Sequence, residues 1–144
     1  MSNAAEALQK VSALYEAMPL LTKFMSRSQI AAVAEAARGE EREHFIDMAL
    51  ELAEHLRTMH KTYEQDGKGD NAIVGLHYFR GGMDWFITER DMEDDQYQAF
   101  GLADLGFGGE LGYICIQELI DNDVELDLYW TPKTLGEVKE VIAA

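Results

Sequence analysis

Four polar residues in the second half of the chain have side chains suited to acid–base or metal chemistry: His77, Glu89, Asp104 and Glu110. Paired carboxylates can act as general acid and general base when their surroundings separate their pKa values. Carboxylate oxygens are also the ligands that hard divalent cations prefer. The sequence leaves open whether the four residues meet in space. One hypothesis is therefore a small divalent-metal-dependent hydrolase or processing enzyme that uses the acids around Glu89 and Asp104.

Cys115 is the only cysteine of the chain and a weaker candidate. It could form a nucleophile pair with His77, but Ile114 and Ile116 flank it, and an apolar strand position is typical of an inert buried thiol. A single cysteine excludes an internal disulfide, which fits a reducing cytoplasm.

Three further segments resemble known sites and lack their essential residues. The glycine-rich run at 104–110 has no Lys-Ser/Thr pair and favours a tight turn between strands. The alternating acids at 121–127 begin like a calcium loop, but Leu126 replaces its glycine and Pro132 its final glutamate. Glu51 and His55 lie one helical turn apart without the usual second histidine. We therefore expect no cofactor, no metal site and no enzymatic activity.

Net charge is the strongest compositional feature. The 144 residues include 12 Lys and Arg against 27 Asp and Glu, which gives a formal charge of −15 and a pI near 4.5. Residues 1–66 carry 7 basic and 11 acidic side chains, and residues 67–144 carry 5 and 16. Such a surface repels phosphate backbones and anionic lipid, so direct binding to nucleic acid or membrane is disfavoured. It favours a basic partner, or it serves solubility alone.

Two segments concentrate these acids and are the expected partner-binding residues. The first contains Asp84, Glu89, Asp91, Glu93, Asp94 and Asp95, and the second contains Glu118, Asp121, Asp123, Glu125 and Asp127. Acids on one face of a strand would lie about 6–7 Å apart, a spacing comparable to that of phosphates along one DNA strand. The pattern indicates an acidic ridge able to occupy a basic groove built for nucleic acid.

Apolar periodicity predicts three or four helices in residues 4–66, followed by strands in 72–144. Pro19 should end or kink the first helix near Met18, and Ser26 or Ser28 should cap the next. The longest helix is expected over residues 40–65, and 66–71 reads as a flexible break too short to separate independent domains.

Strands are expected at 73–80, 85–89, 97–103, 111–115 and 125–130, with short helices at 116–120 and after the capping box formed by Thr134 and Glu137. Gly101 would let a neighbouring chain pack closely. The prediction is a single α+β domain, residues 1–144, with its N-terminal helices on one face of a mostly antiparallel sheet of four or five strands and a short C-terminal helix. The expected core comprises Leu14, Phe45, Leu52, Leu56, Trp85, Ile87, Phe100, Leu111, Ile114, Leu126 and Leu128.

The C-terminal half also carries a recognisable series of short motifs. Trp85, Thr88, Glu89 and Asp91 form a W-x-x-T-E-x-D strand end, and the segments AFGLADLG at 99–106, ELGY at 110–113 and LDLYWTP at 126–132 follow. In these motifs the chain resembles a plasmid- and phage-borne family of small domains of unknown function. The resemblance implies an α+β fold and a mobile-element setting, often among accessory and anti-defence genes, and it assigns no catalytic residues. It leaves the helical N-terminal half unmatched.

These features favour a cytoplasmic, non-enzymatic inhibitor from a mobile element. It would occupy a basic surface of a host protein or nucleoprotein complex that handles nucleic acid, in the manner of an anti-restriction or anti-CRISPR protein. The alternatives are the metal-dependent hydrolase and a dimeric accessory module whose helical half self-associates.

Overall fold

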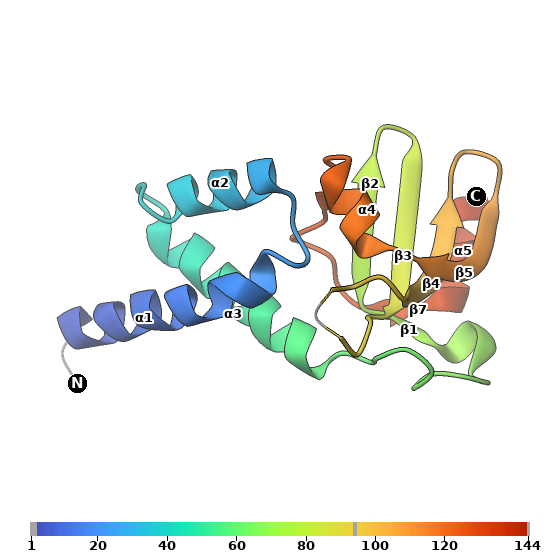
Figure 1. Ribbon diagram of the computed structural model, residues 1–144, viewed down its shortest axis with the longest axis horizontal. Coiled ribbons are helices and arrows are strands. Elements are labelled where there is room, and N and C mark those ends of the chain that lie inside the picture. Colours follow the sequence, from blue (N-terminus) through green and yellow to red (C-terminus); the bar gives the residue numbers. More distant parts are fainter. Residues whose placement is uncertain (1–2, 94, 144) are drawn as a thin grey trace.

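The computed structural model describes residues 3–93 and 95–143, which form the α+β arrangement that the sequence predicts (Figure 1). The helices are α1 (Asn3–Leu21), α2 (Arg27–Ala36), α3 (Arg42–Thr58), α4 (Ile116–Asp121) and α5 (Leu135–Ala143), with a 3₁₀ turn at Gly69–Asn71. The strands are β1 (Ile73–Val74), β2 (Leu76–Arg80), β3 (Met83–Glu89), β4 (Ala99–Asp104), β5 (Gly109–Ile114), β6 (Glu125–Leu126) and β7 (Lys133–Thr134). None of the described helices has the length and apolar character needed to cross a bilayer.

Five strands form one antiparallel sheet in the order β5-β4-β3-β2-β6, while β1 and β7 pair separately. The sheet therefore has two edge strands, β5 and β6. The outer side of β6 is closed by Gln29 of α2, whose side-chain amide exchanges two hydrogen bonds with the backbone of Leu126, at 2.7 and 3.0 Å. These two bonds take the place of a neighbouring strand, so β5 is the edge without such a cover.

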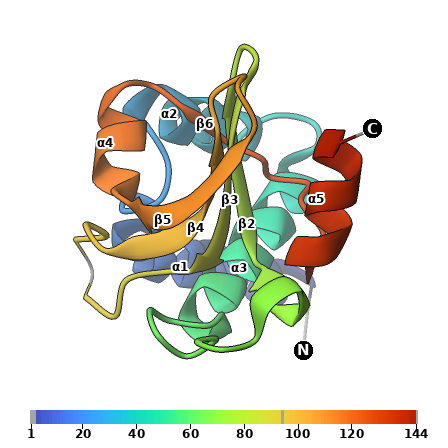
Figure 2. The same cartoon turned by 90° about the vertical axis from the view of Figure 1, so that its right-hand side faces the viewer.

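The two faces of the sheet carry separate apolar clusters, because side chains alternate between faces along each strand. Leu76, Tyr78 and Ile87 face the larger cluster, which also contains buried residues of α1, α3 and α4. Phe86 and Leu102 face the smaller cluster, in which α5 supplies Leu135 and Val138. Figure 2 shows α5 on one side of the sheet and α4 on the other.

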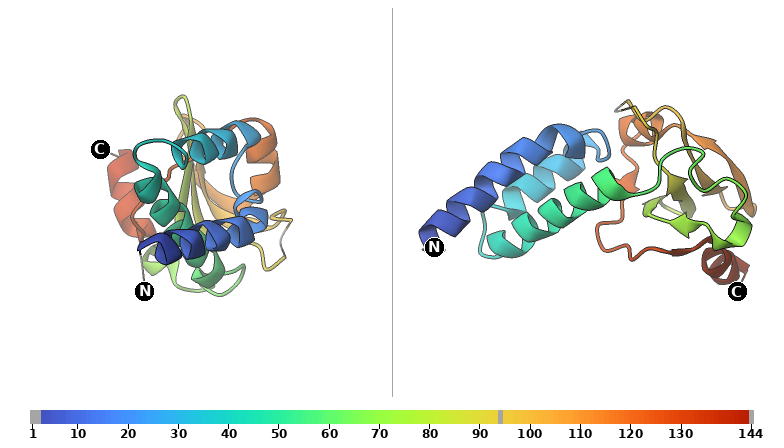
Figure 3. Two further views of the ribbon diagram at one scale, coloured as in Figure 1. Left: turned by 90° about the vertical axis from the view of Figure 1, so that its left-hand side faces the viewer. Right: turned by 90° about the horizontal axis from the view of Figure 1, so that it is seen from below.

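The N-terminal helices meet the larger face by their ends and do not lie flat across it. The buried contacts come from Leu21, Phe24 and Met25 at the end of α1, and from Leu56 and Met59 at the end of α3. The rest of these helices projects from the sheet as a separate layer, which makes the molecule elongated (Figure 3).

The first helix extends beyond the predicted end at Met18, because Pro19 is accommodated in its last turn. The helix ends at Leu21, two residues after the proline. The next residue, Thr22, donates hydrogen bonds from its N–H to Met18 O and from its hydroxyl to Pro19 O. The predicted Ser26 cap is confirmed, since its hydroxyl accepts the N–H of Gln29. A late proline therefore did not stop the helix.

The helix predicted over residues 40–65 is shorter than expected: α3 covers Arg42–Thr58, and its 17 residues make it shorter than α1, which has 19. After Met59 the chain turns extended and pairs with the end of β3, where Thr62 N–H donates to Arg90 O and Arg90 N–H donates to His60 O. These backbone bonds compete with continued helix and end it. The apolar periodicity of 59–65 could not reveal this pairing, which is 28 residues distant along the chain.

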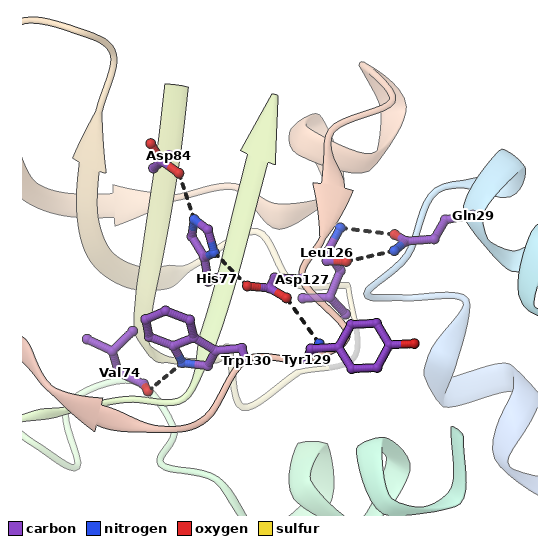
Figure 4. A network of polar contacts seen from close by, with 8 residues as sticks. All are labelled: Gln29, Val74, His77, Asp84, Leu126, Asp127, Tyr129 and Trp130. Atoms are coloured by element: carbon purple, nitrogen blue, oxygen red, sulfur yellow. Dashed lines mark hydrogen bonds and ion pairs between the residues drawn. The ribbon is translucent and has the colours of Figure 1, made fainter. Parts of the chain in front are cut away.

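The last predicted strand, 125–130, is reduced to Glu125–Leu126. Asp127 accepts the N–H of Tyr129 in a local turn at 3.0 Å, and the indole N–H of Trp130 donates to Val74 O, which draws the chain away from β2 (Figure 4). The capping box after this segment is confirmed by the mutual hydrogen bonds of Thr134 and Glu137.

The core prediction is right for most positions and wrong for Leu111, whose side chain is 48% exposed. The reason is that β5 is an edge strand that α5 does not cover. The other expected core residues have these outcomes: Leu56, Ile87, Ile114 and Leu126 are buried, Leu14, Leu52, Trp85 and Leu128 are partly buried against the larger cluster, and Phe45 and Phe100 are intermediate.

Gly101 confirms the predicted close approach. The register of β3 and β4 shifts between Ile87 and Glu89, so that Thr88 forms a bulge. A Cβ atom added at Gly101 would lie 2.0 Å from the carbonyl oxygen of Phe86. The opposite strand position, Gly112 of β5, has open space around its would-be Cβ.

We expect Gly101→Ala to lower the free energy of unfolding by about 3 kcal/mol or to prevent folding, because backbone atoms must shift. Urea denaturation measures this effect. Gly112→Ala is the matched control: it should be neutral or stabilise by up to about 1 kcal/mol. Equal stability of the two variants would contradict the close strand contact.

Candidate functional site

Figure 4 shows a cluster of two carboxylates and an imidazole, which lies on the face of the sheet that Phe86 shares with α5. His77 of β2 places Nε2 2.7 Å from Asp84 Oδ1 and Nδ1 3.1 Å from Asp127 Oδ2. The ring stacks on Phe86, with centroids 4.8 Å apart and planes 9° apart, and also contacts Trp130. A ring that donates from both nitrogens is the imidazolium form, so a protonated His77 would satisfy both carboxylates.

Because both ring nitrogens face carboxylates, His77 has no nitrogen left for a substrate, a metal ion or Cys115. The cluster instead joins three parts of the fold: β2, β3 and the segment after β6. Its geometry is that of a partly buried structural contact, with the His77 side chain 15% exposed.

The four residues that could have formed a hydrolytic site do not converge. His77 is close to Asp84, and Asp84 is the cross-strand partner of Asp104, so these three share one face and one end of the sheet. Glu89 pairs with Phe100 at the other end of β4, roughly 13 Å from Asp104 along the strand. Glu110 pairs with Ala103 and points to the opposite face. No group of three or more metal-binding side chains occurs within residues 3–93 and 95–143.

The first acidic segment is largely internal. Glu89 is 6% exposed and Asp91 is 8% exposed. Asp91 holds the following loop, because its carboxylate accepts the N–H groups of Glu93 and Gln98 at 3.1 and 3.0 Å. Asp84 belongs to the histidine cluster, which leaves Glu93 and Asp95 as exposed carboxylates. The remaining predicted site residue, Asp94, lies outside the described residues.

The second acidic segment is mostly exposed, although only Glu125 lies in a strand. Asp121 ends α4 and accepts a hydrogen bond from Gln117. Asp123 has a left-handed backbone, φ 60°, and the Ser28 hydroxyl that donates to it holds the pKa of its carboxyl below the usual value near 3.8. Asp127 is bound to His77. The expected row of acids at 6–7 Å along one strand is therefore absent from this part of the chain.

Helix α4 connects the two acidic segments in space. Its first residue, Ile116, donates its N–H to Gln96 O in the loop after β3, and at its other end the guanidinium of Arg80 holds the carbonyls of Asn122 and Asp123. Asp123 is exposed as well but is held by Ser28, and we call the other five exposed carboxylates along this path the α4 acidic band: Glu93, Asp95, Glu118, Asp121 and Glu125.

A cleft of about 370 Å³ lies on the side of the sheet that carries α5, opposite α4 and its acidic band. The loop after α3 forms one wall with Tyr63 and Asp66, the ends of β3 to β5 form the floor with Glu89 and Phe100, and α5 forms the remaining wall with Lys139. The hydroxyls of Tyr63 and Tyr113 lie 2.6 Å apart and connect the loop to β5. This hydrogen bond is the main cause that raises the pKa of the Tyr113 hydroxyl above its usual value near 10, so the Tyr113 phenol stays protonated at neutral pH.

Sequence reasoning identified Glu89 but missed Tyr63, Tyr113 and the loop that brings them together. Residues 59–65 continue the apolar period of α3, which predicts helix there. The positive φ of Tyr63, 78°, depends on contacts between the loop and the sheet, and no local sequence signal marks it.

We expect His77→Ala to lower the free energy of unfolding by about 2 kcal/mol, because two partly buried carboxylates lose their hydrogen-bond partner. Adding Asp84→Asn and Asp127→Asn in the same chain should restore part of this loss. Urea denaturation provides the measurement, and His44→Ala, at an exposed position, provides the control. If His77→Ala were as stable as His44→Ala, the cluster would not hold these segments together.

Comparison with known proteins gives a family and no function. A family model described as a protein of unknown function, DUF2958, matches residues 48–133. No curated protein and no solved structure matches the chain. The matched region begins within α3 and includes the whole five-stranded sheet, whereas α1, α2 and α5 lie outside it. The match covers more than half of the chain, which therefore belongs to the DUF2958 family of proteins of unknown function.

Proposed function

We propose that this protein is a non-enzymatic binding protein that uses the α4 acidic band to occupy a basic surface of a partner. The observation that carries the proposal is the state of the five carboxylates in the band. All five are exposed, and within residues 3–93 and 95–143 none of them forms an ion pair with Lys or Arg. Their charge is therefore directed to solvent and available to a partner.

The surrounding charge supports long-range attraction. Residues 67–144 carry 16 acidic and 5 basic side chains. A surface of one sign raises the rate at which an oppositely charged partner associates, and the effect weakens as salt screens it. Because the acids are distributed over a loop, a helix and a strand, the proposed mimicry of nucleic acid concerns the overall potential and not a regular spacing.

The partner that this chemistry suits is a protein with a Lys- and Arg-rich groove, such as a nuclease or another nucleic-acid-handling enzyme. The sequence resemblance to plasmid- and phage-borne proteins adds a setting, in which the target is a host restriction enzyme or CRISPR effector. The protein would then act as an inhibitor that keeps nucleic acid out of that groove.

Phage plating on hosts with an active restriction or CRISPR system tests this proposal. Expression of the protein should raise plating efficiency, and neutralising the band with Glu93→Gln, Asp95→Asn, Glu118→Gln, Asp121→Asn and Glu125→Gln should lower that gain at least about tenfold, chiefly through slower association.

The control neutralises an equal number of exposed acids on the helical half: Glu6, Glu16, Glu35, Glu40 and Glu41, each to Gln. It has the same net charge as the band variant and should retain full protection. Equal loss in both variants would show that only net charge matters, and no protection by the parent in any such host would contradict the inhibitor function.

A second candidate function, self-association through the helical half, is favoured by a different observation. Residues 1–39 carry four basic and three acidic side chains, so the remaining chain holds the whole acidic excess. Their helices enclose an apolar groove of about 260 Å³ lined by Val11, Leu14, Tyr15, Ile30 and Val33. Figure 3 shows these helices at the end of the molecule away from the sheet, so two copies could join by the helices with their acidic halves apart.

Light scattering with size-exclusion chromatography tests this candidate. Tyr15 lines the groove and is 75% exposed in the single chain. The substitution Tyr15→Lys should dissociate a dimer, because it places a charge in the apolar contact. Tyr129→Lys is the control, since Tyr129 is 70% exposed on the sheet half and should leave the dimer intact. A monomeric parent at high protein concentration would exclude this function.

A further inference from the structure

We propose that the cleft between the loop after α3, the floor of β3 to β5 and α5 binds a small organic cation, an alkylammonium or alkylguanidinium group, with Glu89 as its counter-charge. The proposal is independent of the α4 acidic band, because the cleft lies on the other side of the sheet.

The first argument is the state of the Glu89 carboxylate. The residue is more than nine-tenths buried, and among residues 3–93 and 95–143 the one hydrogen-bond partner of its side chain is the hydroxyl of Thr88, 3.2 Å from Oε2. That hydroxyl has a single proton and also lies 3.1 Å from the carbonyl oxygen of Phe100. Glu89 therefore receives at most one shared hydrogen bond, although a buried carboxylate normally accepts several or pairs with a cation.

The second argument concerns the direction of the free oxygen. Every fully buried polar side-chain atom in residues 3–93 and 95–143 has a hydrogen-bond partner. The Oε1 atom of Glu89 has none, so it must reach open space, and Glu89 lines the cleft. A buried carboxylate with a free oxygen at the base of a cleft is arranged to receive a donor from a ligand.

The third argument is the aromatic character of the walls. Tyr63, Phe100 and Tyr113 line the cleft, and Phe100 packs edge-on against Tyr113 with ring centroids 5.7 Å apart. Aromatic faces attract ammonium and guanidinium groups, and they also provide apolar contact for an alkyl chain. Tyr63 adopts a left-handed backbone that is unfavourable for a tyrosine, and strain of this kind is often retained at binding sites.

The fourth argument is the sign of the charge around the opening. Asp66 and Asp70 lie at the cleft with Glu89, and its only basic side chain among the described residues, Lys139, is held by Asp70 at 2.7 Å. Two carboxylates remain uncompensated, which repels anions. A divalent metal fits poorly, because Glu89 has aromatic neighbours in place of the further oxygen ligands that such an ion requires. The volume suits a small organic molecule or one long side chain.

Titration followed by NMR tests the proposal on the full chain. The probes are n-butylammonium and its neutral counterpart of equal size, 1-butanol, together with the methylamide of Nα-acetyl-lysine as a model of a protein side chain. We expect the two cations to shift signals of residues 62–70 and 111–113 with a dissociation constant on the order of 1 mM, and 1-butanol to bind at least about tenfold more weakly. Tighter binding of butylammonium would indicate a free metabolite, and tighter binding of the lysine derivative a protein partner.

Glu89→Gln keeps the size of the side chain and removes its charge. We expect this variant to bind both cations about tenfold to a hundredfold more weakly and to melt at the same or a higher temperature than the parent, because an unsatisfied buried charge is gone. Glu110→Gln, on the other face of the sheet, is the control and should bind as the parent does.

Three results would overturn the proposal. They are binding of the cations that Glu89→Gln does not weaken, equal binding of 1-butanol and butylammonium, and absence of binding by any cationic probe up to its solubility limit. A lower melting temperature for Glu89→Gln than for Glu110→Gln, with cation binding unchanged, would assign Glu89 a purely structural role.

Discussion

The fold depends on the joint between the helical half and the sheet, and Arg90 is the residue that makes it. Its guanidinium donates to Leu56 O at the end of α3 and to Asp91 O, and it lies 5.2 Å from the centre of the Phe24 ring. Its backbone pairs with His60 and Thr62 on the incoming chain. One buried cation thereby ends α3, anchors the segment after α1 and starts the loop that forms the cleft. A charge buried this deeply requires a full set of partners, which fixes the position of every element it contacts.

This joint explains why the acid-rich sequence around Arg90 is only partly a surface. Glu89 and Asp91 flank Arg90 and are buried with it, whereas Glu93 and Asp95 lie in the loop beyond and are exposed. Charge density along a sequence therefore does not equal charge density on a surface. Most acids of the second segment, in contrast, are exposed to solvent, and β6 contains only one of them, Glu125.

The sequence predicted those features that depend on local chemistry. The Ser26 cap, the Thr134 and Glu137 capping box, the tight turn between β4 and β5 and the close packing at Gly101 all follow from residues near one another in the chain. The errors occur where distant contacts decide the outcome: α3 ends because residues 60–62 meet β3, the strand after Leu126 is lost to contacts of Asp127 and Trp130, and Leu111 is exposed because β5 lies at an edge. The cleft was missed for the same reason, since Tyr63 and Tyr113 are 50 residues apart.

The two acidic sites also differ in what their charges cost the fold. The carboxylates of the α4 acidic band are hydrated, so they destabilise the folded state mainly through mutual repulsion, which salt reduces. Glu89 is more than nine-tenths buried and receives at most one shared hydrogen bond from the protein, so its cost is mainly partial desolvation, which salt does not reduce. A glutamine of the same shape would fill the same space without this cost. Packing alone therefore gives no reason for a carboxylate at this position, whereas a cationic ligand in the cleft does.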